Sequence, residues 1–156
     1  MERFKKIEQE RYNQRAIDEN ASEFNLQELP AYHQPPYELY HQILKEALEP
    51  SFRVLELACG MGEHTKTLVE GSKMVVALDI SQSSLDVIKK RFQKSEKVEV
   101  TLADLENLPF ADKSFDLVAC AGSLSYGKNE LVLGDVRRVL RDNGVFICVD
   151  MVATAQ

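Results

Sequence analysis

The sequence has no long hydrophobic run, no secretory signal and no excess of basic residues. A clean apolar run such as Met74–Leu78 is far too short to span a bilayer. The charged N-terminus, MERFKKIEQE, lacks the apolar segment of a signal peptide. Lysine and arginine number 19 against 25 acidic residues, a formal net charge of −6. We therefore expect no binding to nucleic acid or to a membrane through bulk charge.

Cysteine is also scarce, and its spacing excludes two classes of small protein. Cys59, Cys120 and Cys148 are odd in number and form no CxxC pair, so neither a disulfide framework nor a zinc site is expected. Each lies in or beside an apolar run, which predicts buried thiols in a reducing compartment. We place the protein in the cytoplasm and expect no metal.

Two regions of the 156-residue chain have different patterns. Residues 1–50 predict an N-terminal helical cap: an exposed helix over about 1–24, a proline-containing loop, and a second helix with an apolar face. Residues 51–156 alternate short apolar runs with helical patterns, which is typical of an α/β core.

The apolar runs of the core predict five strands, at 52–57, 73–80, 98–102, 115–120 and 145–150. Ser81 is a natural N-cap for a helix over 82–94, Gly71 is expected to follow the end of the preceding helix, and a further helix is expected over 129–140 before a turn at 142–144. Strands that are almost entirely apolar are buried on both faces. The pattern therefore predicts a doubly wound parallel sheet with helices on both faces.

Ligands bind such sheets at the carboxyl ends of the strands, and three features lie there. Gly60 and Gly62 follow the first strand and allow a tight turn close to a ligand. Asp79 ends the second strand, 19 residues after Gly60, where an acid commonly accepts from both ribose hydroxyls. Asp104 ends the third strand and could accept from a base amine, with Leu105 against the base. Each feature alone is common in turns and caps, but together they describe a cleft shaped for adenosine.

The segments VLELACGMGEHT, VVALDIS, ADLENLPF, FDLVACAGS and RVLRDNGVFICVD resemble the class I S-adenosylmethionine-dependent methyltransferases. The similarity is greatest to the methyltransferase-domain group that acts on small molecules and lipids, and it covers residues 52–150. It implies a Rossmann-like sheet of order 3-2-1-4-5, the cofactor S-adenosylmethionine and the product S-adenosylhomocysteine. The cofactor-binding positions that it implies are Glu56, Ala58, Cys59, Gly60, Gly62, Asp79, Ile80, Asp104, Leu105 and Ala121.

By this resemblance, Glu56 and the loop 58–62 hold the methionine end, together with the backbone around Ala121. Asp79 binds the ribose hydroxyls and Ile80 packs on the adenine, which Asp104 and Leu105 also contact. Tyr32 and Tyr37 precede the core and are expected to be lid residues, because N-terminal segments of this family often cover the cofactor.

The sequence also departs from the family pattern. Ala58 stands where the family has glycine, and Asp142-Asn143-Gly144 replaces its usual Pro-Gly-Gly. The family has seven strands, whereas this sequence ends soon after the fifth, so we interpret the chain as lacking the C-terminal part. Such a chain could be inactive by itself. Its fifth strand would be an exposed apolar edge, which favours a homodimer.

The expected reaction is in-line displacement of the methyl group from the sulfonium to a small-molecule acceptor. A base is needed only if the acceptor must lose a proton, so the catalytic residue is left open; the candidates are His33, His41, His64 and Tyr126. His41 also fits an ordinary surface histidine, and His64 fits a packing or capping role. The fourth strand is not followed by the Asn-Pro-Pro-aromatic motif of base methylases, which argues against DNA adenine as substrate.

Two other functions remain open. A fragment of an NAD(P)-dependent oxidoreductase would share the fold, the glycine turn and the ribose acid. It would prefer GxGxxG, however, and the residue three after Gly62 is Thr65. A non-catalytic S-adenosylmethionine-binding subunit would use the same contacts without a base.

Overall fold

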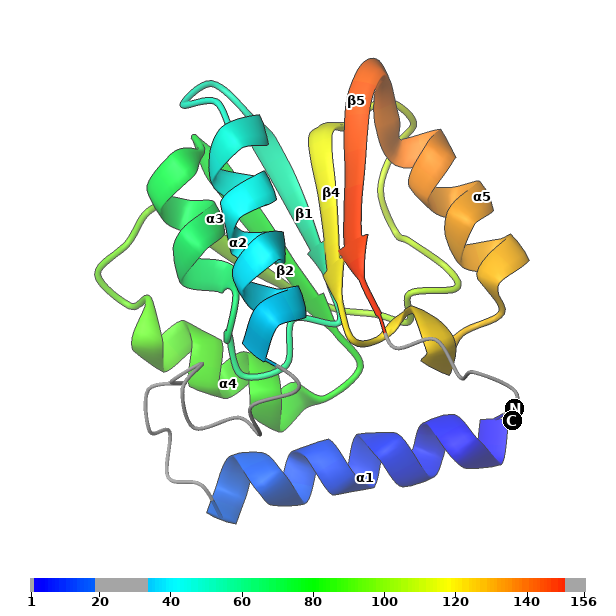
Figure 1. Ribbon diagram of the computed structural model, residues 1–156. Helices are drawn as coiled ribbons and strands as arrows, with labels where there is room; N and C mark the ends of the chain where they lie inside the picture. Colours follow the sequence, from blue (N-terminus) through cyan, green and yellow to red (C-terminus); the bar gives the residue numbers. More distant parts are fainter. Residues whose placement is uncertain (1, 19–33, 151–156) are drawn as a thin grey trace.

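The computed structural model describes residues 2–18 and 34–150. Its centre is a five-stranded parallel sheet of order β3-β2-β1-β4-β5 (Figure 1), which confirms the predicted fold and strand order. The strands are β1 Arg53–Leu57, β2 Met74–Asp79, β3 Val98–Leu102, β4 Phe115–Ala121 and β5 Leu140–Val149. The helices are α1 Glu2–Asp18, α2 Gln34–Ala47, α3 Thr65–Gly71, α4 Gln82–Arg91 and α5 Asn129–Val139, with a 3₁₀ turn, η2, at Leu124–Tyr126.

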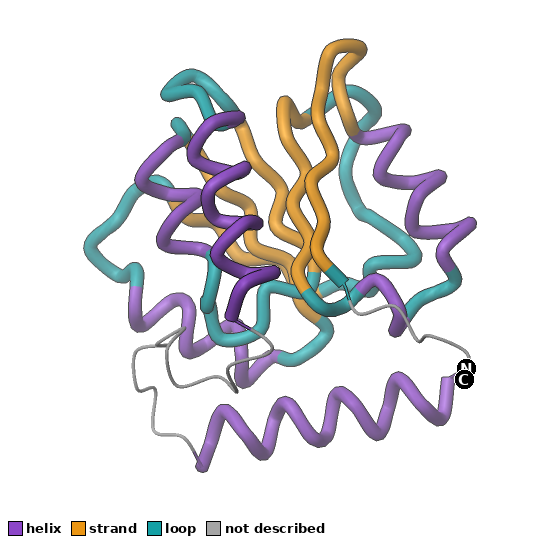
Figure 2. Tube along the Cα trace, in the orientation of Figure 1, coloured by secondary structure: helices purple, strands orange, loops and turns teal. Residues whose placement is uncertain are grey.

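Helices cover both faces of the sheet (Figure 2). Side chains that alternate along β1 point to opposite faces, as the pleat of a strand requires. Val54 packs with Leu44 of α2 and Leu68 of α3, whereas Leu55 packs on the other face with Val132 of α5. None of the helices among the described residues is long and apolar enough to cross a membrane.

Glycine at position 71 has a packing role that was not predicted from the sequence. Gly71 is the last residue of α3, and the cap that follows it is Ser72, so Gly71 does not follow the helix as predicted. A Cβ atom at this position would lie 2.9 Å from Leu48, just beyond the end of α2. Glycine is therefore needed for the close approach of α2 and α3.

Three further predictions differ in detail from the structure. α4 ends at Arg91 rather than at residue 94, because Phe92 leaves the helical conformation. The expected turn at 142–144 lies inside β5, where the pairing with β4 shifts register between Phe115 and Leu117. Cys148 is exposed because it lies on the edge strand, whereas Cys59 and Cys120 are buried as predicted.

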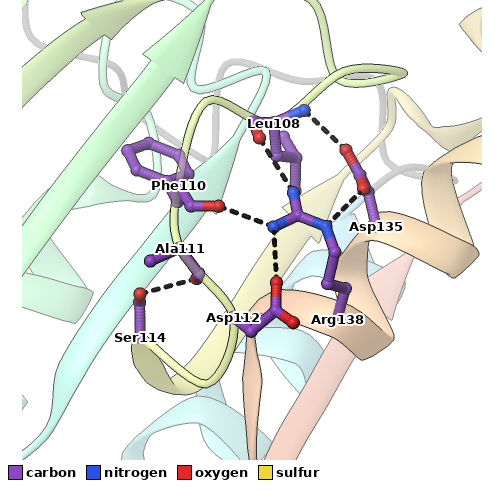
Figure 3. A network of polar contacts seen from close by, with 7 residues as sticks. All are labelled: Leu108, Phe110, Ala111, Asp112, Ser114, Asp135 and Arg138. Carbon is purple, nitrogen blue, oxygen red and sulfur yellow. Dashed lines mark hydrogen bonds and ion pairs between the residues drawn. The ribbon is translucent and has the colours of Figure 1, made fainter.

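Arg138 of α5 binds the loop between β3 and β4 through several hydrogen bonds (Figure 3). The Arg138 guanidinium donates to the carbonyl oxygens of Leu108 and Phe110 at 2.9 and 2.6 Å, and to the carboxylates of Asp112 and Asp135 at 3.1 and 2.9 Å. Asp135 also accepts from the Leu108 N–H at 2.6 Å. We call these five residues the Arg138 network; it lies away from the carboxyl ends of the strands.

Candidate functional site

The loop after β1 adopts the left-handed backbone conformation at three alternate residues. Ala58, Gly60 and Gly62 have φ angles of 49°, 54° and 91°. Glycine adopts these angles without strain, whereas alanine at position 58 is strained. A Cβ atom at Gly62 would also lie 3.3 Å from Ile88 of α4, so the loop packs tightly on that helix. We call residues 58–62 the glycine loop.

Asp79 connects the glycine loop to the end of β2. Its carboxylate accepts from the Gly60 N–H at 2.9 Å and from the Ser81 N–H at 2.8 Å. Ser81 in turn caps α4 by accepting from the Ser84 N–H at 3.2 Å, as predicted. One carboxylate therefore fixes two strand ends at the same edge of the sheet.

Three carboxyl groups near this edge have pKa values that burial raises. Glu56 is buried at the end of β1 and accepts from the Thr65 hydroxyl at 2.6 Å. Desolvation raises the pKa of Glu56 to about 8. Burial also raises the pKa of Glu63 and of Asp79. A cationic ligand would favour the ionised form of these groups.

Two neighbouring cavities lie at the carboxyl edge. The nucleoside cavity, as we call the first, has a volume of about 50 Å³ and includes Ala58, Asp79, Ile80, Asp104 and Leu105 in its lining. The second, the loop cavity, has a volume of about 150 Å³ and includes Cys59, Gly60, Glu63, His64 and Ala121. Both cavities are lined by Tyr12, Ala58 and Ser123. Together they follow the carboxyl ends of β1, β2 and β4.

Helix α1 lies across this edge of the sheet (Figure 1). The Lys5 ammonium group lies 2.6 Å from an Asp104 carboxylate oxygen and 2.5 Å from a Glu106 oxygen. Further along the helix, the Gln9 amide donates to the Ile80 carbonyl oxygen at 2.6 Å. The Ser81 hydroxyl donates to Asn13 at 2.6 Å. Ligand pockets commonly measure about 300–1,000 Å³, so α1 leaves the nucleoside cavity smaller than a typical ligand site.

An aromatic and imidazole cluster lies beside the loop cavity. His64 Nδ1 lies 2.7 Å from His41 Nε2 of α2. The ring of Tyr37 stacks on His64 at 5.2 Å, and Tyr40 meets it edge-on at 5.5 Å. His41 is thus half-buried and bonded, which corrects its interpretation as a surface histidine. His64 packs, as one reading expected, but its side chain makes no capping hydrogen bond to α3.

Most of the cofactor-binding positions expected from the sequence lie around the two cavities. The exceptions are Glu56, which is buried at the end of β1, and Gly62, which packs on α4. Tyr126 lines the nucleoside cavity and Tyr37 the loop cavity, whereas Tyr32 and His33 lie outside the described residues. A helical cap over residues 1–50 was expected, but Lys5 and Tyr12 of α1 were not foreseen, because no local pattern in residues 1–24 distinguishes these two side chains.

The fold and the position of this site define the class of protein. A doubly wound sheet with a glycine loop after β1 and acids at the ends of β2 and β3 is the architecture of the Rossmann-like nucleotide-binding proteins. The sequence profile described as a methyltransferase domain matches residues 54–144, more than half of the chain. The chain belongs to the class I S-adenosylmethionine-dependent methyltransferase family.

Individual relatives agree with this family. A demethylmenaquinone methyltransferase of Clavibacter sepedonicus is 36% identical over 102 residues, which cover 62% of this chain and 40% of the relative. The solved structure of the PH0226 protein from Pyrococcus horikoshii is 30% identical with a TM-score of 0.65, over 76% of this chain and 58% of that one. The chain spans 36–55% of the length of the curated relatives that it matches.

A more distant structure shares the fold. Phosphoethanolamine N-methyltransferase 1 of Haemonchus contortus, solved with phosphoethanolamine and S-adenosylhomocysteine, has a TM-score of 0.68 and 21% identity. The match covers 76% of this chain and 26% of that protein.

Proposed function

We propose that the protein transfers a methyl group from S-adenosylmethionine to a small-molecule acceptor. The observation that carries this proposal is the convergence of Glu56, Asp79 and Asp104 at one edge of the sheet, beside two neighbouring cavities, in a chain of this family. The domain limits that go with it are a helical cap over residues 1–50 and a cofactor-binding core over 51–156.

The nucleoside cavity fits the adenosine half of the cofactor. Asp79 would accept from the ribose hydroxyls through the carboxylate that now holds the Gly60 and Ser81 amides. Ile80 and Leu105 offer apolar contact to the adenine, and Asp104 would accept from its amine. Asp104 is paired with Lys5 at 2.6 Å, so adenine binding requires Lys5 and α1 to move.

The loop cavity fits the methionine half. The N–H groups of the glycine loop and the backbone near Ala121 would meet the amino-acid end of the cofactor. Glu56 is buried behind this loop. Its carboxylate would attract the α-ammonium group of the cofactor, and that cation would in turn stabilise the ionised carboxyl. The chemistry that the bound cofactor supplies is an activated methyl group on a positively charged sulfur.

A small acceptor is supported by three observations. The two cavities lie beneath α1 and have volumes of about 50 and 150 Å³, which suits a small molecule better than a polymer. The net charge of −6 does not favour nucleic acid. The Clavibacter relative is named for a quinone substrate. The homodimer and the cytoplasmic location expected from the sequence stay predictions.

The test is calorimetric titration of the full chain with S-adenosylmethionine, S-adenosylhomocysteine and NADH. We expect both sulfur cofactors to bind and NADH not to bind. Binding of NADH alone would support the oxidoreductase reading and overturn the proposal.

A transfer assay then separates an enzyme from a binding subunit. Radiolabelled S-adenosylmethionine is incubated with a panel of acceptors that includes demethylmenaquinol and phosphoethanolamine, and labelled products are counted. Label on one acceptor supports the proposal. Cofactor binding without transfer to any acceptor would favour the non-catalytic subunit.

A further inference from the structure

The paired histidines connect the loop cavity with α2. His64 lines the loop cavity, and its Nδ1 lies 2.7 Å from Nε2 of the half-buried His41. An imidazole has two distinct ring nitrogens, so it can accept a proton at one nitrogen and donate a proton from the other. Two imidazoles in series therefore form a path for a proton out of the cavity.

We propose that His64 is the catalytic base of the methyl transfer and that His41 relays the proton from it to solvent. This inference rests on the proposed function. It assigns one base among the candidates and gives His41 a positioning and relay role. It also implies that the acceptor carries an ionisable O–H, N–H or S–H group, because an acceptor without such a proton needs no relay.

The surroundings of His64 fix its ring. Tyr37 stacks on the imidazole with an interplanar angle of 21°, and Tyr40 meets it at 85°. Tyr37 also reaches across the cavity, since a Cβ atom at Gly122 would lie 2.8 Å from its hydroxyl. The ring of His64 therefore packs on residues of α2, and Tyr37 connects this cluster with the turn after β4.

The charge balance around His64 explains why a single histidine is insufficient. Burial lowers its pKa to about 3, and His41 adds to that shift, so a protonated His64 is unfavourable. Burial and Lys45 also lower the pKa of His41. The charged residues that line the loop cavity are Arg15 and Glu63, and burial raises the pKa of Glu63. When His64 takes up a proton at one ring nitrogen, it must therefore pass the proton of its other ring nitrogen to His41.

With S-adenosylmethionine bound, the acceptor would form a bond to its methyl carbon as the bond from that carbon to sulfur breaks, and the electron pair of the broken bond would stay on sulfur, which loses its positive charge. The acceptor proton passes to His64 Nε2, the proton on His64 Nδ1 passes to His41 Nε2, and His41 releases its Nδ1 proton to water. Exchange with water restores both tautomers when the product leaves.

The first test needs no acceptor. In the full chain labelled with ¹⁵N-histidine and saturated with S-adenosylhomocysteine, NMR measures how fast the His64 imidazole proton exchanges with water. We expect exchange to slow at least tenfold in His41→Gln, because glutamine can accept a hydrogen bond but cannot pass a proton on. Gln42→Ala, a change at the exposed neighbour on α2, should leave the rate unchanged.

Equal exchange in the wild type and in His41→Gln would overturn the relay. If His41→Gln fails to fold, the exchange rate of the His64 imidazole proton in the wild type provides the test. Exchange as slow as that of the buried β1 amides would contradict the proposal. Failure of S-adenosylhomocysteine to bind would instead contradict the proposed function.

The second test uses the acceptor that turns over in the transfer assay. We expect His64→Gln to lower kcat by about 10²-fold, the usual contribution of a general base, with the KM for S-adenosylmethionine within threefold of wild type. His41→Gln should lower kcat less. An unchanged kcat in His64→Gln, with transfer intact, would show that His64 only packs.

Discussion

Two acids at the carboxyl edge, Glu56 and Asp79, differ in their electrostatic surroundings from Asp135 of the Arg138 network. The pKa of Asp135 is lowered by its hydrogen bond to Arg138. The pKa values of Glu56 and Asp79 are raised by burial. Asp135 is ion-paired with the guanidinium, whereas Glu56 accepts from a hydroxyl group and Asp79 accepts from backbone N–H groups.

This difference separates a structural contact from a binding site. Ionised groups are rarely buried without a partner, because desolvation costs more than neutral hydrogen bonds return. Asp135 is only half-buried, and its charged partner lies within the protein. Glu56 and Asp79 meet the requirement for a partner only in part, and a ligand with hydroxyl donors and a cationic end would complete it.

The largest effect is expected for Asp79→Ala. Loss of an acceptor for two ribose hydroxyls should weaken S-adenosylhomocysteine binding by about 2–4 kcal/mol, which is on the order of 30–1,000-fold. Calorimetry measures the change, with Asp112→Ala in the Arg138 network as the control that keeps wild-type affinity. A change of less than threefold would remove Asp79 from the ribose site. Thermal unfolding checks that the variant is folded.

Arg138→Met should have the reverse profile. The carbonyl oxygens of Leu108 and Phe110 lose their charged donor, so the free energy of unfolding should fall by about 2 kcal/mol. Cofactor affinity should not change. The matched control is Arg137→Met, at the exposed position before Arg138 in α5. Urea denaturation measures the free energy of unfolding of both variants. Lost cofactor affinity without lost stability would show that the Arg138 network contributes to the cofactor site.

Glu56→Gln should change the pH dependence of stability. An acid whose pKa rises from about 4.3 in the unfolded chain to about 8 in the native protein costs stability as pH rises between those values. Between pH 4.5 and 6, the wild type should therefore lose on the order of 2 kcal/mol of stability relative to Glu56→Gln. Unfolding curves across that range test this. Parallel pH profiles would mean that Glu56 is ionised in the native protein.

The smallest effect is expected at α1. Lys5→Met removes a partly exposed ion pair worth about 0.5–1 kcal/mol, so S-adenosylhomocysteine should associate roughly twofold to fivefold faster. Lys6→Met, at the exposed neighbour, should leave the rate unchanged. Stopped-flow fluorescence measures both. Equal rates in all three proteins would show that the Lys5 contacts do not limit entry.

The sheet could be predicted from the sequence because its strands depend on local patterns. Runs such as Val75–Leu78 are buried on both faces, which specifies parallel strands without knowledge of their neighbours. The errors occur where a tertiary contact decides the outcome. Gly71 reads as a helix end but is required by Leu48, and Cys148 reads as buried but lies on the sheet edge.

The residues of the site could likewise be predicted only where they follow from the order of the strands. Positions at strand ends, such as Asp79 and Asp104, follow from topology, because carboxyl ends of parallel strands share one edge. The contacts of Lys5 with Asp104 and of His41 with His64 join residues 99 and 23 positions apart. No periodicity or spacing encodes such a pairing, so these contacts were found only in the structure.

An NMR titration of the ¹⁵N-labelled chain with S-adenosylmethionine would show whether the cofactor binds at the carboxyl edge. We expect the amide signals of Gly60, Asp79 and Leu105 to shift and saturate together, while those of Asp135 and Arg138 stay unchanged. Saturable shifts centred on the Arg138 network, or no shifts at millimolar cofactor, would contradict the account.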